Sequence, residues 1–284
     1  MLTVKNVTKK YGDFTVLENI SLEFENGVYA LLAPNGAGKT TLIKMLTTLI
    51  FPTDGEILYN GTDIVKLDEE YREILGFLPQ QFGYYKSYSP EQYLMYLAAL
   101  KGLKKEDAKK KIAELLKLVA LEDVADKRMR KFSSGMIQRV GIAQAMLNDP
   151  KILILDEPTA GLDPKERVRF RNIISELSHN RTVILSTHIV SDIETIATRV
   201  VMIKDHALLC CSGVGEVCEI LRGKLFEMSA SSQLADGDLF ISERQDASDM
   251  KIRFVSENPP SAAVPVTPNL EDVFLYIYRD EVAK

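Results

Sequence analysis

The sequence predicts an α/β fold built on a parallel sheet that helices cover on both faces. Continuous apolar runs at residues 152–155, 183–185 and 200–203 indicate buried strands, because strands covered on both faces need not alternate with polar residues. Helical patterns at 165–177 and 189–197 lie between these runs. Strands that alternate with helices favour parallel pairing.

An antiparallel β lobe is expected before this sheet. Short β-rich runs at 2–7, 14–24 and 28–32 are separated by Gly-Asp and Asn-Gly turn signals. The third run is expected to lead into the core sheet. From Lys39, apolar residues recur at helical spacing and stop before Pro52. A strand, a glycine-rich loop and a helix therefore follow one another in this region.

A helical subdomain is predicted at about residues 82–145. Its first part holds two helical patterns, at 90–100 and 106–119, which are interrupted at Gly102. Because no strand pattern falls between them, we expect this insert to form a compact helical unit of its own.

The last part of the chain has a different composition. Strand-like runs at 225–228, 239–242 and 250–255 lie among Ser, Asp and Gly, and a closing helix is expected after the capping residue Asn269. We therefore divide the chain into a main domain at 1–223 and a small α+β accessory domain at 224–284.

Composition and charge narrow the function classes. The 284 residues carry a net charge of −5, and Lys and Arg are spread along the chain, so no basic field favours a nucleic-acid partner. The cysteines Cys210, Cys211 and Cys218 are bunched together, which suits a reducing compartment. No window reaches the ~18 uninterrupted apolar residues of a membrane span. Any membrane role is expected to come through a partner.

A phosphate-binding loop is predicted between an apolar strand and a helix. Its glycines, Gly36 and Gly38, allow backbone N–H groups to curl round a phosphate, and Lys39 supplies charge for the β and γ oxygens. Thr40 supplies a hydroxyl for Mg²⁺. Ala33 stands where glycine is usual. The residues assigned to this loop are Asn35, Gly36, Ala37, Gly38, Lys39, Thr40 and Thr41.

Two carboxylates end the apolar run at 152–155. Ligand sites in parallel sheets lie beyond the carboxyl ends of the strands, and buried charge without a partner is costly. We therefore assign Asp156 to Mg²⁺ and Glu157 to the base that activates water. Together with the phosphate loop, this pair predicts an ATPase or GTPase of the phosphate-loop class.

The segment Phe132-Ser133-Ser134-Gly135, followed by a Gln-Arg pair, lies shortly before this strand. It resembles the signature loop of ATP-binding cassette proteins, and the order of motifs over residues 1 to about 215 is similar to that family. The resemblance implies a phosphate-loop NTPase cassette that binds ATP and Mg²⁺. Ser134 departs from the usual glycine, and its extra CH₂OH is expected to weaken the loop's approach to phosphate.

The resemblance also implies roles for four further residues. Tyr11 would stack on adenine. Gln80, rather than Gln81, would sense Mg²⁺ and the attacking water. Asp163 would cross to a partner subunit, and His188 would contact the γ-phosphate. The catalytic residues predicted are thus Glu157, His188 and Gln80; the predicted metal ligands are Thr40, Gln80 and Asp156; and Tyr11, Ser133, Ser134, Gly135 and Asp163 join the phosphate loop in binding nucleotide.

The family's exporters imply the partners. The resemblance implies an integral membrane permease subunit, a second copy of the chain or a homologous ATPase subunit, and a position at the cytoplasmic face of the membrane. Tyr84 and Tyr85 are the docking candidates for the permease, whereas Tyr93 and Tyr96 are expected in the helical core. The tail, with its Leu-Glu-Asp-Val-Phe sequence at 270–274, is similar to the appended domain of drug, antibiotic and bacteriocin exporters.

Two alternatives stay open at this stage. One is an ATPase of the same family that acts without a membrane partner, on ribosomes or DNA; the single cassette and acidic balance weigh against it. The other is a regulatory module that holds ATP with little turnover. Ala33 and Ser134 favour that module, whereas Glu157 and His188 oppose it.

Overall fold

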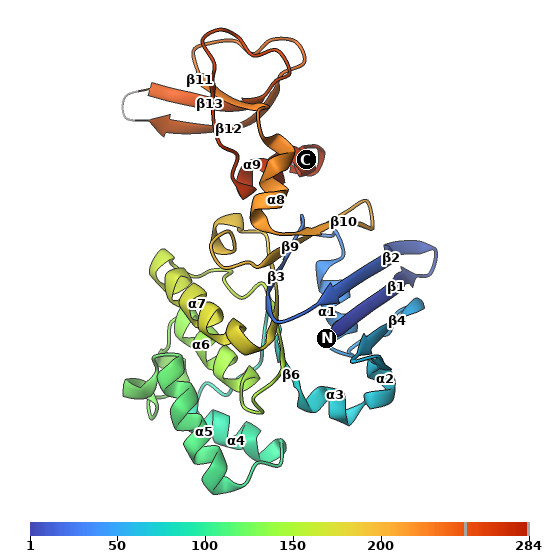
Figure 1. Cartoon of the computed structure of the whole chain (residues 1–284). Helices are drawn as coiled ribbons and strands as arrows, with labels where there is room; N and C mark the ends of the chain where they lie inside the picture. Colours follow the sequence, from blue (N-terminus) through green and yellow to red (C-terminus); the bar gives the residue numbers. More distant parts are fainter. Residues whose placement is uncertain (247–248, 283–284) are drawn as a thin grey trace. The chain divides into compact units, whose positions relative to one another are not determined.

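A computed structural model describes residues 1–246 and 249–282 (Figure 1). The chain divides into two compact units, Met1–Cys211 and Ser212–Lys284. The predicted boundary at residue 223 falls inside the second unit. The short helix α8 (Val214–Cys218) contacts the last helix, α9 (Leu270–Val282), and this packing assigns residues 212–223 to the second unit.

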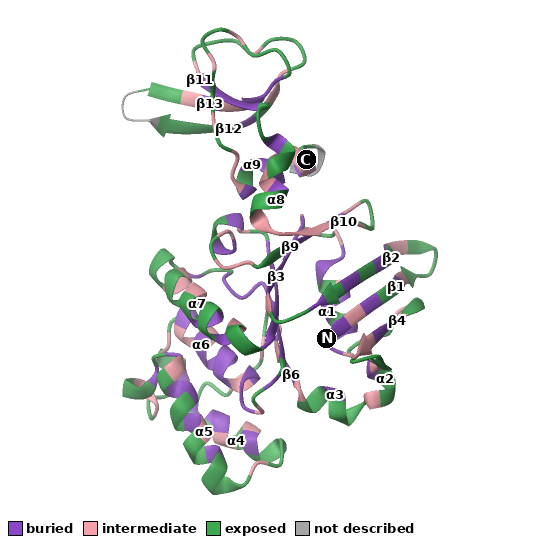
Figure 2. Ribbon diagram, in the orientation of Figure 1, coloured by how far each residue is buried: buried purple, intermediate pink, exposed green. Residues whose placement is uncertain are grey.

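The first unit is built on a six-stranded sheet with the strand order β10-β9-β3-β8-β7-β6. Strands β9, β3, β8, β7 and β6 pair in parallel, as the apolar runs predict. Every residue of β7 and β8 is buried, and Figure 2 shows the buried centre of this unit. The strands are β3 (Gly27–Leu32), β6 (Leu75–Leu78), β7 (Ile152–Asp156), β8 (Thr182–Thr187), β9 (Arg199–Lys204) and β10 (Ala207–Ser212).

An antiparallel sheet of order β2-β1-β4-β5 forms the predicted β lobe. Strands β1 and β2 form a hairpin in which Tyr11 pairs with Phe14, and the register shifts beside Val16. The lobe comprises β1 (Leu2–Tyr11), β2 (Phe14–Phe24), β4 (Asp54–Tyr59) and β5 (Thr62–Asp63), and the short helices α2 (Ile64–Leu67) and α3 (Glu69–Glu73) follow it in the sequence.

Helices flank the six-stranded sheet: α6 (Ser134–Ala145) and α7 (Pro164–Leu177) lie on one side, and α1 (Lys39–Leu46) lies on the other (Figure 1). The predicted helical insert contains α4 (Pro90–Leu100) and α5 (Lys105–Leu118), which pack against each other and against α6. Ser89 begins α4 with a capping box to Gln92. Ala108, Ile112 and Leu115 form the buried stripe of α5.

The prediction of a helix over residues 189–197 is wrong. Only a 3₁₀ turn, Val190–Asp192, forms there, and it is followed by turns. Asp192 is 3% exposed and forms ion pairs with Arg167 and Arg171 of α7, at 4.0 and 3.5 Å. The apolar residues that suggested a helical face are those that anchor this connection to the core, such as Val190 and Ile193, both buried.

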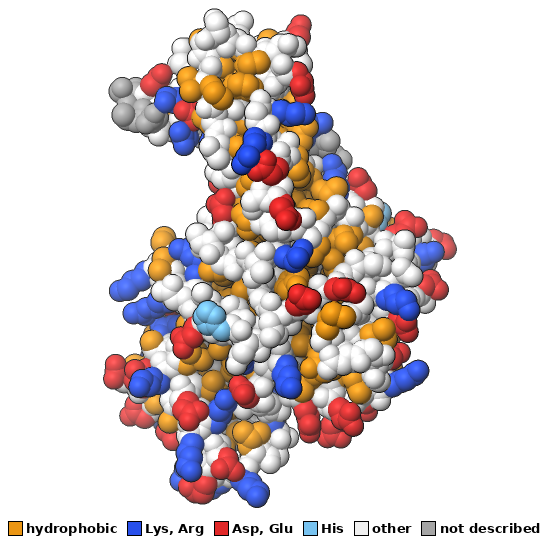
Figure 3. All heavy atoms as spheres, in the orientation of Figure 1, with side chains coloured by type: hydrophobic (Ala, Val, Ile, Leu, Met, Phe, Trp, Pro, Cys, Tyr) orange, Lys and Arg blue, Asp and Glu red, His pale blue; other side chains and the backbone are white. Residues whose placement is uncertain are grey.

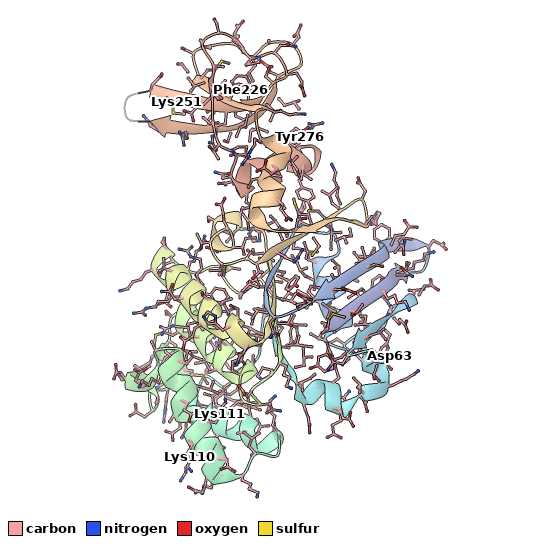
Figure 4. The ribbon with its side chains drawn as sticks, viewed as in Figure 1. Asp63, Lys110, Lys111, Phe226, Lys251 and Tyr276 are labelled. Carbon is pink, nitrogen blue, oxygen red and sulfur yellow. The ribbon has the colours of Figure 1, made fainter. Side chains whose placement is uncertain are left out.

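The second unit contains a four-stranded sheet of order β12-β13-β11-β14 and the helices α8 and α9. Phe226, Met228, Ile252 and Phe254 form its apolar core. Phe226 and Lys251, labelled in Figure 4, come from the neighbouring strands β11 and β13. The strands are β11 (Leu225–Ser229), β12 (Leu239–Asp246), β13 (Asp249–Val255) and β14 (Val264–Pro265).

An ionic network around the buried carboxylates of Glu227 and Asp272 ties this sheet to α9. Glu227 is 6% exposed and lies 2.9 Å from Arg244 and 3.3 Å from Lys251. Arg253 pairs with Asp272 in the first turn of α9 at 2.6 Å. Asn269 and Asp272 exchange hydrogen bonds of 2.9 and 2.8 Å between backbone N–H and side chain, so the predicted cap at Asn269 is confirmed.

Candidate functional site

A cavity of about 220 Å³ opens where the loop after β3 meets the carboxyl ends of the neighbouring strands. Gly36 and Gly38 have φ values of +87° and +101°, which side chains other than glycine rarely adopt. A Cβ at Gly38 would also approach Leu17 to 2.6 Å. The cavity is lined by Val16, Asn35, Gly36, Gly38, Lys39, Thr40, Thr41, Gln80, Glu157 and His188.

Lys39 is the buried cation of this cavity. It is 6% exposed, and its Nζ donates to the carbonyl oxygens of Ala33 and Pro34 at 2.5 and 3.0 Å. Burial lowers the pKa of Lys39, and the charges of Glu157 and Asp156 oppose this shift. A phosphate placed against the loop would offer the ammonium group a stronger, anionic acceptor.

The two carboxylates at the carboxyl end of β7, Asp156 and Glu157, are held in different ways. Asp156 is 5% exposed, and its Oδ1 accepts a hydrogen bond of 2.6 Å from the Ser186 hydroxyl. That hydroxyl in turn accepts from the backbone N–H of Glu157 at 2.9 Å. Ser186 thus fixes both acids from the adjacent strand, β8. The sequence interpretation missed Ser186, although its position at the polar end of a buried strand was a usable signal.

Glu157 and His188 contact each other at the cavity wall. Glu157 has a left-handed backbone, with φ of +48°, and its Oε2 lies 2.9 Å from Nδ1 of His188. The carboxyl side chain is 9% exposed and the imidazole 49%. A non-glycine residue in this conformation turns its side chain away from the normal strand direction. Here the turn brings the carboxylate to the histidine.

The structure separates Gln80 from its neighbour. Gln80 lines the cavity, whereas Gln81 does not. Thr40 and Thr41 line it from the first turn of α1. Ala37 lies in the loop, with its N–H 3.4 Å from the carbonyl oxygen of Pro34.

Tyr11 lies at the end of β1 and is 52% exposed. It is not among the residues that line the cavity. The Nζ of Lys9 lies 5.1 Å from its ring centroid, a cation–π contact that steadies the ring. Phe14, its partner in the hairpin, is 63% exposed. Two accessible aromatic rings therefore stand at the tip of the β1–β2 hairpin.

The predicted signature loop does not reach this cavity within the described chain. Ser133 caps α6, its hydroxyl accepting from the N–H of Met136 at 3.2 Å, and Ser134 donates to the carbonyl oxygen of Gly161 at 3.3 Å. Asp163 caps α7 by accepting from the N–H of Glu166 at 2.9 Å. None of Ser133, Ser134, Gly135 and Asp163 lines the cavity that holds Lys39.

Glu166 and Arg139 set the position of this loop. A Cβ on Gly135 would come within 2.7 Å of the Glu166 side chain, so a larger residue here would displace Glu166. Glu166 pairs with Arg139 at 3.1 Å, and Arg139 donates to the carbonyl oxygens of Val119 and Ala120, both at 2.8 Å. The sequence interpretation did not identify Glu166 as part of this arrangement, because only the fold brings α7 to α6.

Comparison with known proteins gives the family. A family model described as "ABC transporter" matches residues 17–160. The chain belongs to the ABC transporter family. An uncharacterized ABC transporter ATP-binding protein of Bacillus subtilis (strain 168), YxlF, is 37% identical over 82% of this chain and 78% of that protein. The bacitracin transport ATP-binding protein BcrA of Bacillus licheniformis is 37% identical over 74% of this chain and 68% of that protein.

Solved structures of ABC cassettes have the same fold. The dimeric bacterial ABC transporter cassette MJ0796 superimposes with a TM-score of 0.67 at 28% identity, over 75% of this chain and 98% of that one. A second structure of that cassette is described as a post-hydrolysis state bound to ADP and Pi. This ABC subunit is accordingly an ATP-binding protein and an ATPase.

The helices were also compared with the length and apolar character of a membrane span. Within residues 1–246 and 249–282 of this ABC subunit, no helix combines the length and apolar character that crossing a bilayer requires. Figure 3 shows acidic and basic side chains interspersed on the visible face rather than gathered into one field.

Proposed function

We propose that this ABC subunit is the ATP-hydrolysing motor of an exporter and works as a head-to-tail pair of cassettes. The observation that carries the proposal is the separation of Ser133 and Gly135 from the Lys39 cavity. A second cassette, turned head to tail, would bring its own signature loop to that cavity. Each ATP would then lie between Lys39 of one chain and Ser133 of the other.

Hydrolysis in this pair would depend on Glu157. Its carboxylate would accept a proton from the attacking water, whose oxygen bonds to the γ-phosphorus as the bond to the β–γ bridging oxygen breaks and ADP leaves. The 2.9 Å contact with Nδ1 of His188 holds Oε2 at the cavity wall. His188 would contact the γ-phosphate, and Gln80 would orient the water.

Mg²⁺ is part of the proposal, and the residues fit it. The Thr40 hydroxyl, the Gln80 amide oxygen and the Asp156 carboxylate are oxygen donors of the kind Mg²⁺ prefers, with phosphate and water completing its shell. Of the described residues, no three or more His, Cys, Asp and Glu gather into a metal cluster, so protein groups alone would not form a cage. When bound, the ion would neutralise charge on the β and γ oxygens.

The exporter assignment rests on relatives and on an aromatic surface. Similar proteins are named for bacitracin transport, lantibiotic transport and Nod factor export. Tyr85, Tyr88 and Tyr96 form an aromatic platform with ring centroids 4.9, 5.7 and 6.5 Å apart. Tyr85 and Tyr96 are 50% and 40% exposed. We propose that a permease subunit docks here and holds the ATPase at the cytoplasmic face of the membrane.

The platform changes the assignment of individual tyrosines. Tyr93 is 4% exposed and donates to the carbonyl oxygen of Gly83 or to Oε1 of Gln144, at 3.0 and 2.7 Å, so its predicted core position is confirmed. The core assignment of Tyr96 is wrong, because residue 96 lies on the outer face of α4. Tyr84 is half-buried against Phe82, with ring centroids 6.0 Å apart.

Replacing Glu157 with Gln tests the proposed function. The amide keeps the shape of the side chain but cannot take the proton, and loss of a positioned base typically lowers the rate ~10²–10⁴-fold. ATP should still bind. The closed pair should therefore accumulate with ATP, as measured by light scattering beside a turnover assay. Glu176→Gln, an exposed change on α7, is the control.

Two outcomes would contradict parts of this proposal. Hydrolysis at the unchanged rate in Glu157→Gln would remove Glu157 from the base role. An inactive variant that binds ATP yet stays monomeric would leave the base role standing and argue against a pair formed by this chain alone.

A further inference from the structure

The turn between β9 and β10 reaches the nucleotide end of the β lobe. It consists of Asp205 and His206, with φ values of +49° and +68°. Two left-handed residues make the hairpin turn in which glycine is strongly preferred at the second position. A bulky side chain in that conformation costs free energy, and such strain persists where surrounding contacts determine it. His206 therefore needs an explanation that the turn itself does not supply.

The contacts of His206 supply one. Its carbonyl oxygen accepts from the N–H of Glu18 at 2.8 Å, and its Nδ1 lies 3.3 Å from the carbonyl oxygen of Val16. Its ring meets Phe14 edge-to-face, with centroids 5.8 Å apart and planes at 88°. One backbone contact and two contacts of the exposed imidazole thus hold His206 against β2.

These contacts lie between the phosphate cavity and Tyr11, the ring proposed to stack on the base. Val16 lines the phosphate cavity and has no partner in the β1–β2 ladder, which shifts register there; such bulges re-aim side chains beside functional sites. Phe14 pairs with Tyr11. His206 therefore sits beside the wall that runs from the phosphate cavity to the proposed base-stacking ring.

We propose that His206 positions the purine base and sets a preference for adenine over 6-oxopurines. A carbonyl oxygen can only accept, so the contact with Val16 assigns the proton to Nδ1 and leaves Nε2 of the neutral ring as an acceptor. Adenine offers a donor, its 6-amino group. Guanine and hypoxanthine offer an acceptor, the 6-oxo group. The inference rests on the nucleotide site proposed above.

Nucleotide binding measured with ATP, GTP and inosine triphosphate tests the inference. The variants are His206→Gly and His206→Asn, because both residues suit the left-handed turn and neither carries an imidazole. The control is His179→Asn, whose histidine lies in the 3₁₀ turn Ser178–Asn180 after α7. In both His206 variants we expect ATP to bind about 3- to 10-fold more weakly, the effect of one hydrogen bond. Binding of inosine triphosphate and GTP should change little.

The possible results separate this inference from the function it rests on. A preference for ATP that is lost in both His206 variants and kept in His179→Asn supports it. An unchanged preference in folded His206→Gly and His206→Asn, or an unaltered chain that binds all three nucleotides equally, overturns it. A Lys39→Ala variant that binds ATP normally would instead overturn the phosphate-site assignment itself.

Discussion

At the residue scale, the cavity is made by side chains whose positions depend on their strand ends. Asp156 ends β7 and Glu157 follows it, while Ser186 is the last residue but one of β8 and His188 follows that strand. The motif order in the sequence predicted the acids and the histidine. It did not predict that one serine hydroxyl would join the two acids, since Ser186 and Asp156 are 30 residues apart and meet only after parallel pairing.

Tyr11 is predicted to stack on the adenine base of ATP. Stacking of a base on an aromatic ring contributes ~1–3 kcal/mol, so Tyr11→Ala should weaken ATP binding by about tenfold. Because the side chain is 52% exposed, the fold should be unaffected. Calorimetric titration with ATP measures the change. Tyr11→Phe keeps the stacking face and should bind nearly as well as the unaltered chain.

One result would contradict the stacking role of Tyr11. If Tyr11→Ala binds ATP as tightly as the unaltered chain while circular dichroism shows the fold intact, the stacking role is excluded. Phe14, more exposed than Tyr11, would then be the next ring to replace.

Among the helices and strands, long segments with periodic apolar residues were predictable from the sequence. Short segments, and segments held by contacts with distant elements, were not. Helices α4, α5 and α7 lie where their apolar spacing predicts. Strands β4 and β6, of six and four residues, carried no pattern strong enough to assign. The turns over 193–196 replaced an expected helix, because two arginines of α7 hold Asp192 in place. That ionic contact between distant elements has no trace in local periodicity.

The loop before α6 carries Ser134 at the position where the family usually has glycine. Ser134 adds a side chain where a backbone would approach phosphate, and its hydroxyl donates to Gly161 at 3.3 Å. We expect Ser134→Gly to show the same or stronger ATP-dependent pairing. The change should stay below about tenfold, because an exposed hydrogen bond contributes ~1 kcal/mol or less. Analytical ultracentrifugation in the Glu157→Gln background measures it.

Ser134→Ala is the matched control, since it removes the hydroxyl and keeps the Cβ. If bulk limits the approach, the alanine variant should pair less strongly than the glycine variant. Loss of the pair in both variants would show that the contact with Gly161 is needed, and would contradict the prediction.

At the scale of the whole molecule, the chain consists of two units with different chemistry. All residues of the predicted nucleotide site fall in Met1–Cys211. Composition alone suggested a boundary at residue 223, where Ser, Asp and Gly become frequent. The structural division at 211 could not be read from composition, because α8 looks like a continuation of the cassette until it is placed against α9.

Two truncated chains distinguish these boundaries. A chain that ends after Ser212 keeps β10 whole, whereas one that ends after Gly223 also keeps Val217 and Leu221, which are 2% and 0% exposed in the full chain. Without α9, the longer chain should expose these apolar side chains, and we expect it to aggregate more and to unfold at a temperature several degrees lower.

Both chains should bind ATP, because the phosphate cavity lies in the first unit. Both should pair less readily with a second copy or a permease if the second unit helps assembly. Thermal unfolding, light scattering and ATP titration are the measurements, with the full chain as control. A chain ending after Ser212 that fails to fold, beside a stable one ending after Gly223, would place residues 213–223 in the cassette and restore the boundary that the composition suggested.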